Sequence, residues 1–144
     1  MKYVDVLIIG AGPSGLAAAI ALRKAGIKKI LVVEREAIAG GVPRHCQHTG
    51  FGIRDMYRVL TGPDYARRYV QQAEVTGVEI ATNTMVTGWS GEKSVQVTSP
   101  TGIEQIVANA IVLATGCRER PRSGRLIPGS RPEGIFTTGA LQQW

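Results

Sequence analysis

The amino-acid sequence predicts an α/β fold in which a parallel sheet carries a small antiparallel meander. Three observations predict it. Short aliphatic and β-branched runs at 3–9, 30–33, 78–81 and 110–114 have the length and composition of buried parallel strands. Segments with helical spacing of apolar residues separate the first three runs. Alternating segments joined by Gly-containing turns precede the fourth.

The first third of the chain predicts a βαβ unit. The opening strand stops at Gly10, and apolar residues then recur at helical spacing until Gly26, a residue type that commonly ends helices. The second strand stops at Glu34. Two parallel strands joined in this way are expected to have a right-handed crossover.

The middle of the chain is less regular. The Gly-rich stretch 39–62 is predicted to be irregular, and loops of this length are often functional. Pro63 stands at an early helical position, and an apolar stripe predicts a helix up to Gly77. That stripe includes Tyr65 and Tyr69, which we therefore expect in the core.

Three alternating segments then predict an antiparallel meander, with turns between them: 85–89, 95–99 and 103–107. The fourth parallel strand follows as a separate element. We expect both tryptophans, Trp89 and Trp144, to pack. The last segment, 117–144, is rich in Arg, Pro and Gly and is predicted to be irregular.

Composition excludes several function classes. The 144 residues suit one domain, and the net charge of +6 comes from scattered Lys and Arg with no run longer than two. Such scatter argues against a nucleic-acid surface and favours an anionic cofactor or a covering partner. The two cysteines, Cys46 and Cys117, form no C-x-x-C pair, so we expect a reducing, cytoplasmic setting. No signal peptide or membrane span is expected.

The turn after the first strand carries a dinucleotide-binding pattern. Gly10 would permit the tight turn, Gly12 would let a pyrophosphate approach the backbone, and Gly15 would let the helix pack closely. The phosphates would lie at the helix N-terminus. Glu34 would accept hydrogen bonds from the ribose hydroxyls and disfavours a 2′-phosphate, although Arg35 follows it directly. The pattern itself does not separate FAD from NAD.

The chain resembles the FAD-binding N-terminal region of pyridine nucleotide–disulfide oxidoreductase-like flavoproteins. The resemblance is carried by the Gly pattern within 5–15, by Gly40-Gly41 after Glu34, and by Ala114-Thr115-Gly116 followed by Ile127-Pro128-Gly129. It implies a Rossmann-type sheet that binds FAD rather than NAD, with the adenine near the backbone of Val86. It also implies an FAD-binding domain at 1–116 and, at 117–144, a crossover toward an NAD-binding domain.

Together these arguments predict one set of cofactor contacts: Gly10, Gly12, Pro13, Ser14, Gly15, Glu34, Arg35, Gly41, Val86, Ala114, Thr115 and Gly116. The resemblance implies that the chain belongs to a longer enzyme and is not catalytically complete alone. We therefore expect a C-terminal domain or partner subunit to cover it, or self-association through exposed interdomain surface.

The number of cysteines after the Gly-Gly pair differs from that of the disulfide reductases in this family and argues against dithiol chemistry. Disulfide reductases of this group place a Cys pair soon after the Gly-Gly pair, whereas this chain has only Cys46 there. The segment 41–62 resembles instead the flavin subunits of amine, opine, cyanide-forming and sarcosine-type complexes, and flavoproteins that accompany glycerol-3-phosphate dehydrogenase-like subunits. We expect an FAD-dependent oxidoreductase in which NAD(P)H or a small molecule reduces flavin N5.

Alternatives remain for the roles of single residues and for the function of the whole chain. His45, Cys46 and His48 are candidate catalytic groups beside the flavin, or else ordinary loop residues, and no metal site is expected. Arg44 and Arg54 are candidate anion contacts. The rival functions are an NAD-dependent dehydrogenase with a single Rossmann domain and a non-catalytic nucleotide-binding subunit.

Overall fold

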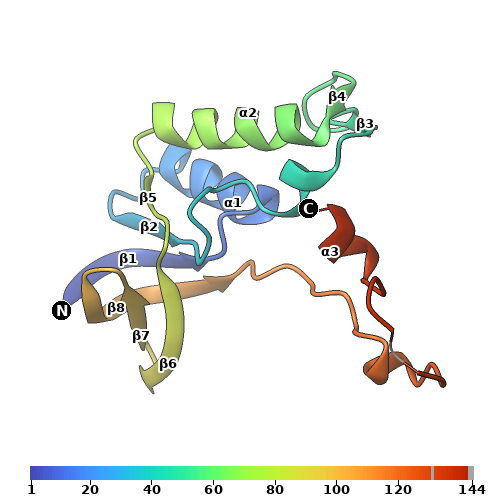
Figure 1. Cartoon of the computed structure of the whole chain (residues 1–144). Coiled ribbons are helices and arrows are strands. Elements are labelled where there is room, and N and C mark those ends of the chain that lie inside the picture. The colour runs from blue at the N-terminus through green and yellow to red at the C-terminus, as the bar shows by residue number, and fades with distance from the viewer. Residues whose placement is uncertain (131, 143–144) are drawn as a thin grey trace.

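Four parallel strands and an antiparallel meander, which have one strand in common, form one sheet in the computed structural model, which describes residues 1–130 and 132–142 (Figure 1). β1 (Lys2–Ile9) lies between β2 (Ile30–Val33) and β8 (Gly102–Leu113), and β5 (Glu79–Ala81) borders β2. All of these pairs are parallel. β7 (Ser94–Ser99) and β6 (Met85–Gly91) complete the order β5-β2-β1-β8-β7-β6. The predicted fold class is confirmed.

One expectation about the sheet is wrong. The third meander strand and the fourth parallel strand are a single element, β8, rather than two. Its first half pairs antiparallel with β7, and it pairs in parallel with β1 from Ile106 to Leu113. The residue pattern changes along β8 because its neighbours change, and in the sequence such a change resembles a break between two strands.

Two layers cover the parallel strands. α1 (Pro13–Lys24) and α2 (Gly62–Val75) lie on one side of β1, and the meander lies on the other (Figure 1). Alternate residues of β1 serve the two faces: Ile8 packs with Leu16 and Ile20 of α1, whereas Leu7 packs with meander residues such as Val95. The two predicted helices are therefore confirmed. No helix in the described residues is long and apolar enough to cross a membrane.

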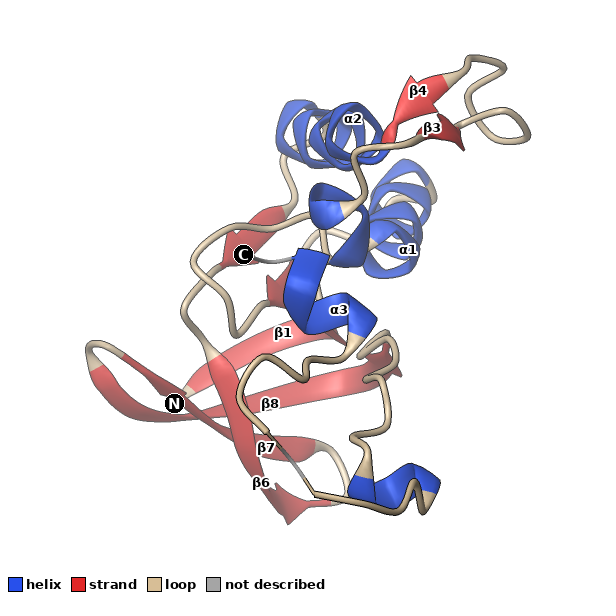
Figure 2. Cartoon of the chain, turned by 45° about the vertical axis from the view of Figure 1, so that its right-hand side comes forward, coloured by secondary structure: helices blue, strands red, loops and turns tan. Residues whose placement is uncertain are grey.

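The stretch 39–62 is more regular than predicted. It contains a 3₁₀ helix, η1 (Val42–His45), and a short antiparallel pair, β3 (Thr49–Phe51) and β4 (Leu60–Thr61). The C-terminal segment likewise holds a 3₁₀ helix, η2 (Ser123–Arg125), and a short α-helix, α3 (Thr138–Gln142) (Figure 2). These elements are too short to leave a periodic pattern in the sequence.

The expectations for large aromatic residues are only partly met. Trp89 is 60% exposed, because β6 is an edge strand with β7 as its one neighbour in the sheet. Trp144 lies outside the described residues. Tyr65 and Tyr69 are half-buried rather than buried in the core. Only Tyr69 packs against the core cluster beneath the helices.

A polar cluster explains the position of these tyrosines. Both hydroxyls donate to Oδ2 of Asp55, at 2.7 Å from Tyr65 and 2.6 Å from Tyr69. Their rings meet edge to face with centroids 5.1 Å apart. Burial, and then the hydrogen bond to Asp55, raises the pKa of both tyrosines above the ordinary 10.0. Burial alone would raise the pKa of Asp55, but the hydrogen bonds from the two hydroxyls and from backbone amides together lower it.

We expect this cluster to make stability depend on alkaline pH. The pKa of each tyrosine is higher in the folded protein than in the unfolded chain. The folded state therefore has its full stabilisation from this cluster below about pH 10, and loses it as the pH rises toward the folded-state pKa. Urea unfolding between pH 8 and 11 should show a steeper loss in the wild type than in Tyr65→Phe/Tyr69→Phe. Tyr57→Phe is the control, because Tyr57 is 90% exposed. Its loss of stability with pH should match that of the wild type. Equal slopes for all three proteins would contradict this role.

Candidate dinucleotide-binding site

The turn between β1 and α1 is held tightly at Gly10. Its φ of +108° is a conformation that favours glycine, and its N–H donates to Val33 O at 2.9 Å. A Cβ at this position would lie 2.3 Å from the carbonyl oxygen of Ala114. Ala114 itself donates to Ile9 O at 2.9 Å. The turn therefore lies directly beside the chain that leaves β8, as the predicted site requires.

Gly15 is required by packing. A Cβ at Gly15 would lie 2.0 Å from the carbonyl oxygen of Gly10 and 3.2 Å from Cβ of Ala114. Both distances are shorter than ordinary van der Waals contact. The first turn of α1 can therefore approach the end of β1 only because position 15 has no side chain.

Gly12 differs from its neighbours because the chain itself gives no reason for a glycine there. Its φ of −76° and ψ of 176° suit any residue. A Cβ would meet only Cα of Gly41, at 3.9 Å, which is an ordinary contact. The missing side chain therefore leaves free space at the N-terminus of α1.

The two long helices begin differently. In α2, Thr61 is the N-cap, its Oγ1 accepts from the Asp64 amide at 3.3 Å, and Asp64 adds a negative charge in the first turn. In α1, the N-cap is Gly12, Pro13 is the first helical residue, and the first turn carries no acidic residue. The partial positive charge at the start of α1 is therefore available to an anion from outside the chain.

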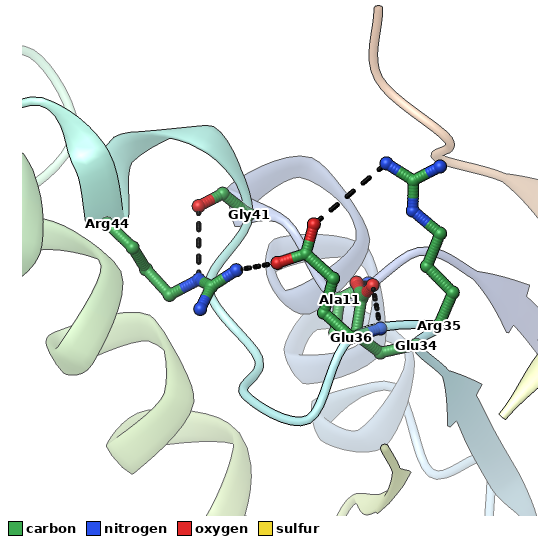
Figure 3. A network of polar contacts seen from close by, with 6 residues as sticks. All are labelled: Ala11, Glu34, Arg35, Glu36, Gly41 and Arg44. Carbon is green, nitrogen blue, oxygen red and sulfur yellow. Dashed lines mark hydrogen bonds and ion pairs between the residues drawn. The ribbon is translucent and has the colours of Figure 1, made fainter. Parts of the chain in front are cut away.

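Glu34 is held at the end of β2 by its own backbone surroundings (Figure 3). Its Oε2 accepts from the Ala11 amide at 2.9 Å, and its Oε1 accepts from the Glu36 amide at 3.1 Å. Its carbonyl oxygen accepts from Thr84, just before β6. A carboxylate oxygen has more than one acceptor position, so this orientation leaves room for hydroxyl donors.

Two arginines lie close to the carboxylate of Glu36, two residues after Glu34. Arg35 lies 3.9 Å from the carboxylate of Glu36, which also binds the guanidinium of Arg44 (Figure 3). Sequence reasoning named Arg44 as an anion contact, but not its partner. Arg54, the other arginine so named, is exposed. No local pattern pairs Glu36 with Arg44, because the fold of the connecting loop creates the contact.

The remaining predicted cofactor contacts are spread over several elements. Ala114 meets the turn, whereas Thr115 and Gly116 are exposed beyond it, and Gly116 has a φ of +68°. Val86 is half-buried on β6 and packs against the core on the meander side. Pro13 is half-buried and Ser14 is exposed on the first turn of α1, while Gly41 lies against Gly12.

The three candidate catalytic residues have different surroundings. Cys46 is buried, and its thiol donates to Val42 O at 3.7 Å. His48 is exposed, with Nδ1 3.0 Å from Thr49 O and its ring 5.2 Å from that of Phe51. His45 is half-buried at the end of η1. Among residues 1–130 and 132–142, no three His, Cys, Asp or Glu side chains gather closely enough to hold a metal ion.

Comparison with known proteins places this chain in a family. The family described as pyridine nucleotide-disulphide oxidoreductase matches residues 4–143, which is nearly the whole chain. The chain belongs to this family. The resemblance drawn from the Gly pattern, the Gly-Gly pair and the segment after β8 is thereby confirmed, and the family consists of FAD-dependent oxidoreductases.

Individual members agree with this assignment. One of the subunits of opine oxidase from Agrobacterium tumefaciens (strain Ach5) is 29% identical over 97% of this chain, which covers 28% of that protein. Thioredoxin reductase of Listeria monocytogenes is 30% identical over 83% of the chain and 35% of its own length. The crystal structure of L-proline dehydrogenase from P. horikoshii superposes with a TM-score of 0.66 and 25% identity, over 79% of this chain and 22% of that one. The chain thus spans about a third or less of these family members.

Proposed function

We propose that this chain binds the ADP part of FAD and forms the FAD-binding unit of an oxidoreductase. The observation that carries the proposal is the free space at Gly12, beside an α1 N-terminus that has no acidic residue in its first turn. A pyrophosphate fits such a place because amide N–H groups and the helix dipole both favour an anion. Gly41 borders the same space, and Ser14 and Gly15 contribute amides from the first turn of α1.

The adenosine end has its own residues. Glu34 would accept hydrogen bonds from the ribose hydroxyls, since its carboxylate is already fixed by two amides. The same negative charge disfavours a 2′-phosphate, and Glu36 partly neutralises Arg35, which would otherwise attract one. Val86 would contact the adenine through its backbone, because β6 begins next to Glu34. Ala114, Thr115 and Gly116 would pass beside the bound dinucleotide.

FAD, when bound, supplies hydride acceptance at N5 and passes the electrons to an acceptor. We propose NAD(P)H or a small molecule as the reductant, without a dithiol step, because only one cysteine lies in 40–62. We further propose 1–116 as the FAD-binding unit, 117–144 as a crossover segment, and a further domain or a partner protein that completes the active site. The names of two similar proteins, opine oxidase and L-proline dehydrogenase, favour an amino-acid-like substrate.

A spectrum of the purified protein tests the cofactor assignment. After incubation with FAD and desalting, we expect flavin absorbance near 450 nm to stay with the protein, at roughly one FAD per chain. Excess ADP should displace it, since the proposed contacts are with the ADP part. A colourless protein that quenches NADH fluorescence would favour the NAD-dependent dehydrogenase instead. A protein that binds neither compound would overturn the proposed cofactor site.

A further inference from the structure

Arg44 makes contacts that an ordinary surface arginine lacks. Only 16% of its side chain is exposed. Its Nε donates to the carbonyl oxygen of Gly41 at 3.3 Å, and its Nη2 donates to the carboxylate of Glu36 (Figure 3). An exposed ion pair contributes little because both side chains keep alternative positions. A half-buried guanidinium bound to two acceptors is fixed in one geometry.

These contacts enclose the Gly40-Gly41 pair. The Gly40 amide donates to Ala11 O at 2.7 Å, and a Cβ at Gly40 would lie 3.1 Å from Cδ of Arg44. A Cβ at Gly41 would lie 2.8 Å from Cα of Gly12. The glycine pair is therefore held between the stem of Arg44 and the turn that borders the proposed pyrophosphate position.

Glu36 connects the same pair to the ribose end of the site. Its amide donates to Oε1 of Glu34 at 3.1 Å, and its carbonyl oxygen accepts from Asn83 at 3.0 Å. Glu36 therefore contacts Glu34 through its backbone amide and Arg44 through its carboxylate. One ion pair thus joins the part of the connecting loop beside Glu34 to the part beside Gly41.

We infer that Arg44 is a positioning residue, which acts with Glu36 to hold Gly41 beside Gly12 and Glu34 in its ribose-binding orientation. The inference rests on the proposed function for its ligand, but the positioning itself is a property of the protein without cofactor. The competing account is that Arg44 binds the pyrophosphate directly. The two accounts differ at Glu36. Glu36→Gln removes the negative charge that pairs with the guanidinium. This would preserve or strengthen a direct contact with the pyrophosphate but would weaken positioning.

The experiment compares Arg44→Met, Glu36→Gln and the double variant with Arg67→Met. Arg67 is the matched control, since its ion pair with Asp64 lies within α2 and is exposed. Two quantities are measured on each protein: the amide hydrogen exchange of peptides covering 9–16 and 38–46 without FAD, and the Kd for FAD by flavin fluorescence. Thermal unfolding shows that each variant is folded.

We expect Arg44→Met to raise the Kd for FAD roughly tenfold, and Glu36→Gln to raise it as well. Both should speed exchange in 38–46, whereas Arg67→Met should change neither quantity. The double variant should be no worse than Arg44→Met, because both changes break one contact. Unchanged exchange, or faster exchange with an unchanged Kd, would overturn the inference, and so would tighter binding in Glu36→Gln. A wild type that binds no FAD overturns the proposed function instead, and hydrogen exchange still decides whether Arg44 holds the loop.

Discussion

Gly12→Ala is expected to weaken FAD binding by about 100-fold, equivalent to about 2.7 kcal/mol, without destabilising the protein in the absence of FAD. The backbone at Gly12 is in an extended conformation open to alanine, and the added methyl would meet only Gly41, at 3.9 Å. The free space would be filled, so a pyrophosphate could no longer approach the backbone. Gly12→Ala should therefore lower the affinity for FAD and leave the free energy of unfolding unchanged.

The control for this change is Gly88→Ala on β6, where a Cβ would likewise make only ordinary contacts, the nearest at 3.7 Å from Oε1 of Gln96. Both variants should unfold at the wild-type temperature or slightly above it, since alanine reduces the entropy of the unfolded chain. A titration with FAD, monitored by flavin fluorescence, should show weaker binding in Gly12→Ala and wild-type binding in Gly88→Ala. Wild-type affinity in Gly12→Ala would show that the dinucleotide does not pass over this residue.

Gly15→Ala should act in the opposite way, on folding first. Its methyl would lie 2.0 Å from the carbonyl oxygen of Gly10, an atom of the backbone that cannot rotate away. Either α1 moves off the end of β1 or the turn deforms, and both changes disturb the core around Leu16 and Ile20. We expect a loss of about 3 kcal/mol or more in the free energy of unfolding, which corresponds to a fall of about 10 °C in the unfolding temperature.

Urea unfolding of the protein without FAD measures this loss directly. Gly88→Ala is again the matched control and should keep the wild-type midpoint. FAD added to Gly15→Ala should restore little stability, because the deformed turn is also the proposed binding surface. If Gly15→Ala unfolded like the wild type, the close approach of helix and strand would not be the reason for this glycine.

Local pattern was enough for most of the fold. The strand predicted at 30–33 is β2 without change of bounds. The helix expected with Pro63 at an early position begins at Gly62, with Thr61 as its cap. Such features depend on residues a few positions apart: a β-branched run, a glycine that ends an element, a threonine that accepts from an amide three residues later. The positive φ of Gly10 belongs to the same class.

The errors arose where contacts with segments distant in sequence decide which residues are exposed and where an element ends. The residue pattern divides β8 in two because one half faces β7 and the other faces β1, and each half follows its own rule of exposure. The size of Trp89 suits a core, yet this residue lies on an edge strand. Tyr65 and Tyr69 follow an apolar stripe, but Asp55 in a preceding loop draws both hydroxyls to the surface.

The sequence alone determined the parallel sheet, the glycine turn and the acidic residue after β2, because these need only short-range spacing and residue type. The tertiary structure alone decided which distant residues border these glycines. They are Ala114 beside Gly10 and Gly15, and Gly41 beside Gly12. The tertiary structure also paired Arg44 with Glu36 across a loop. Contacts between distant segments depend on how the whole chain folds back on itself, and no local pattern records them.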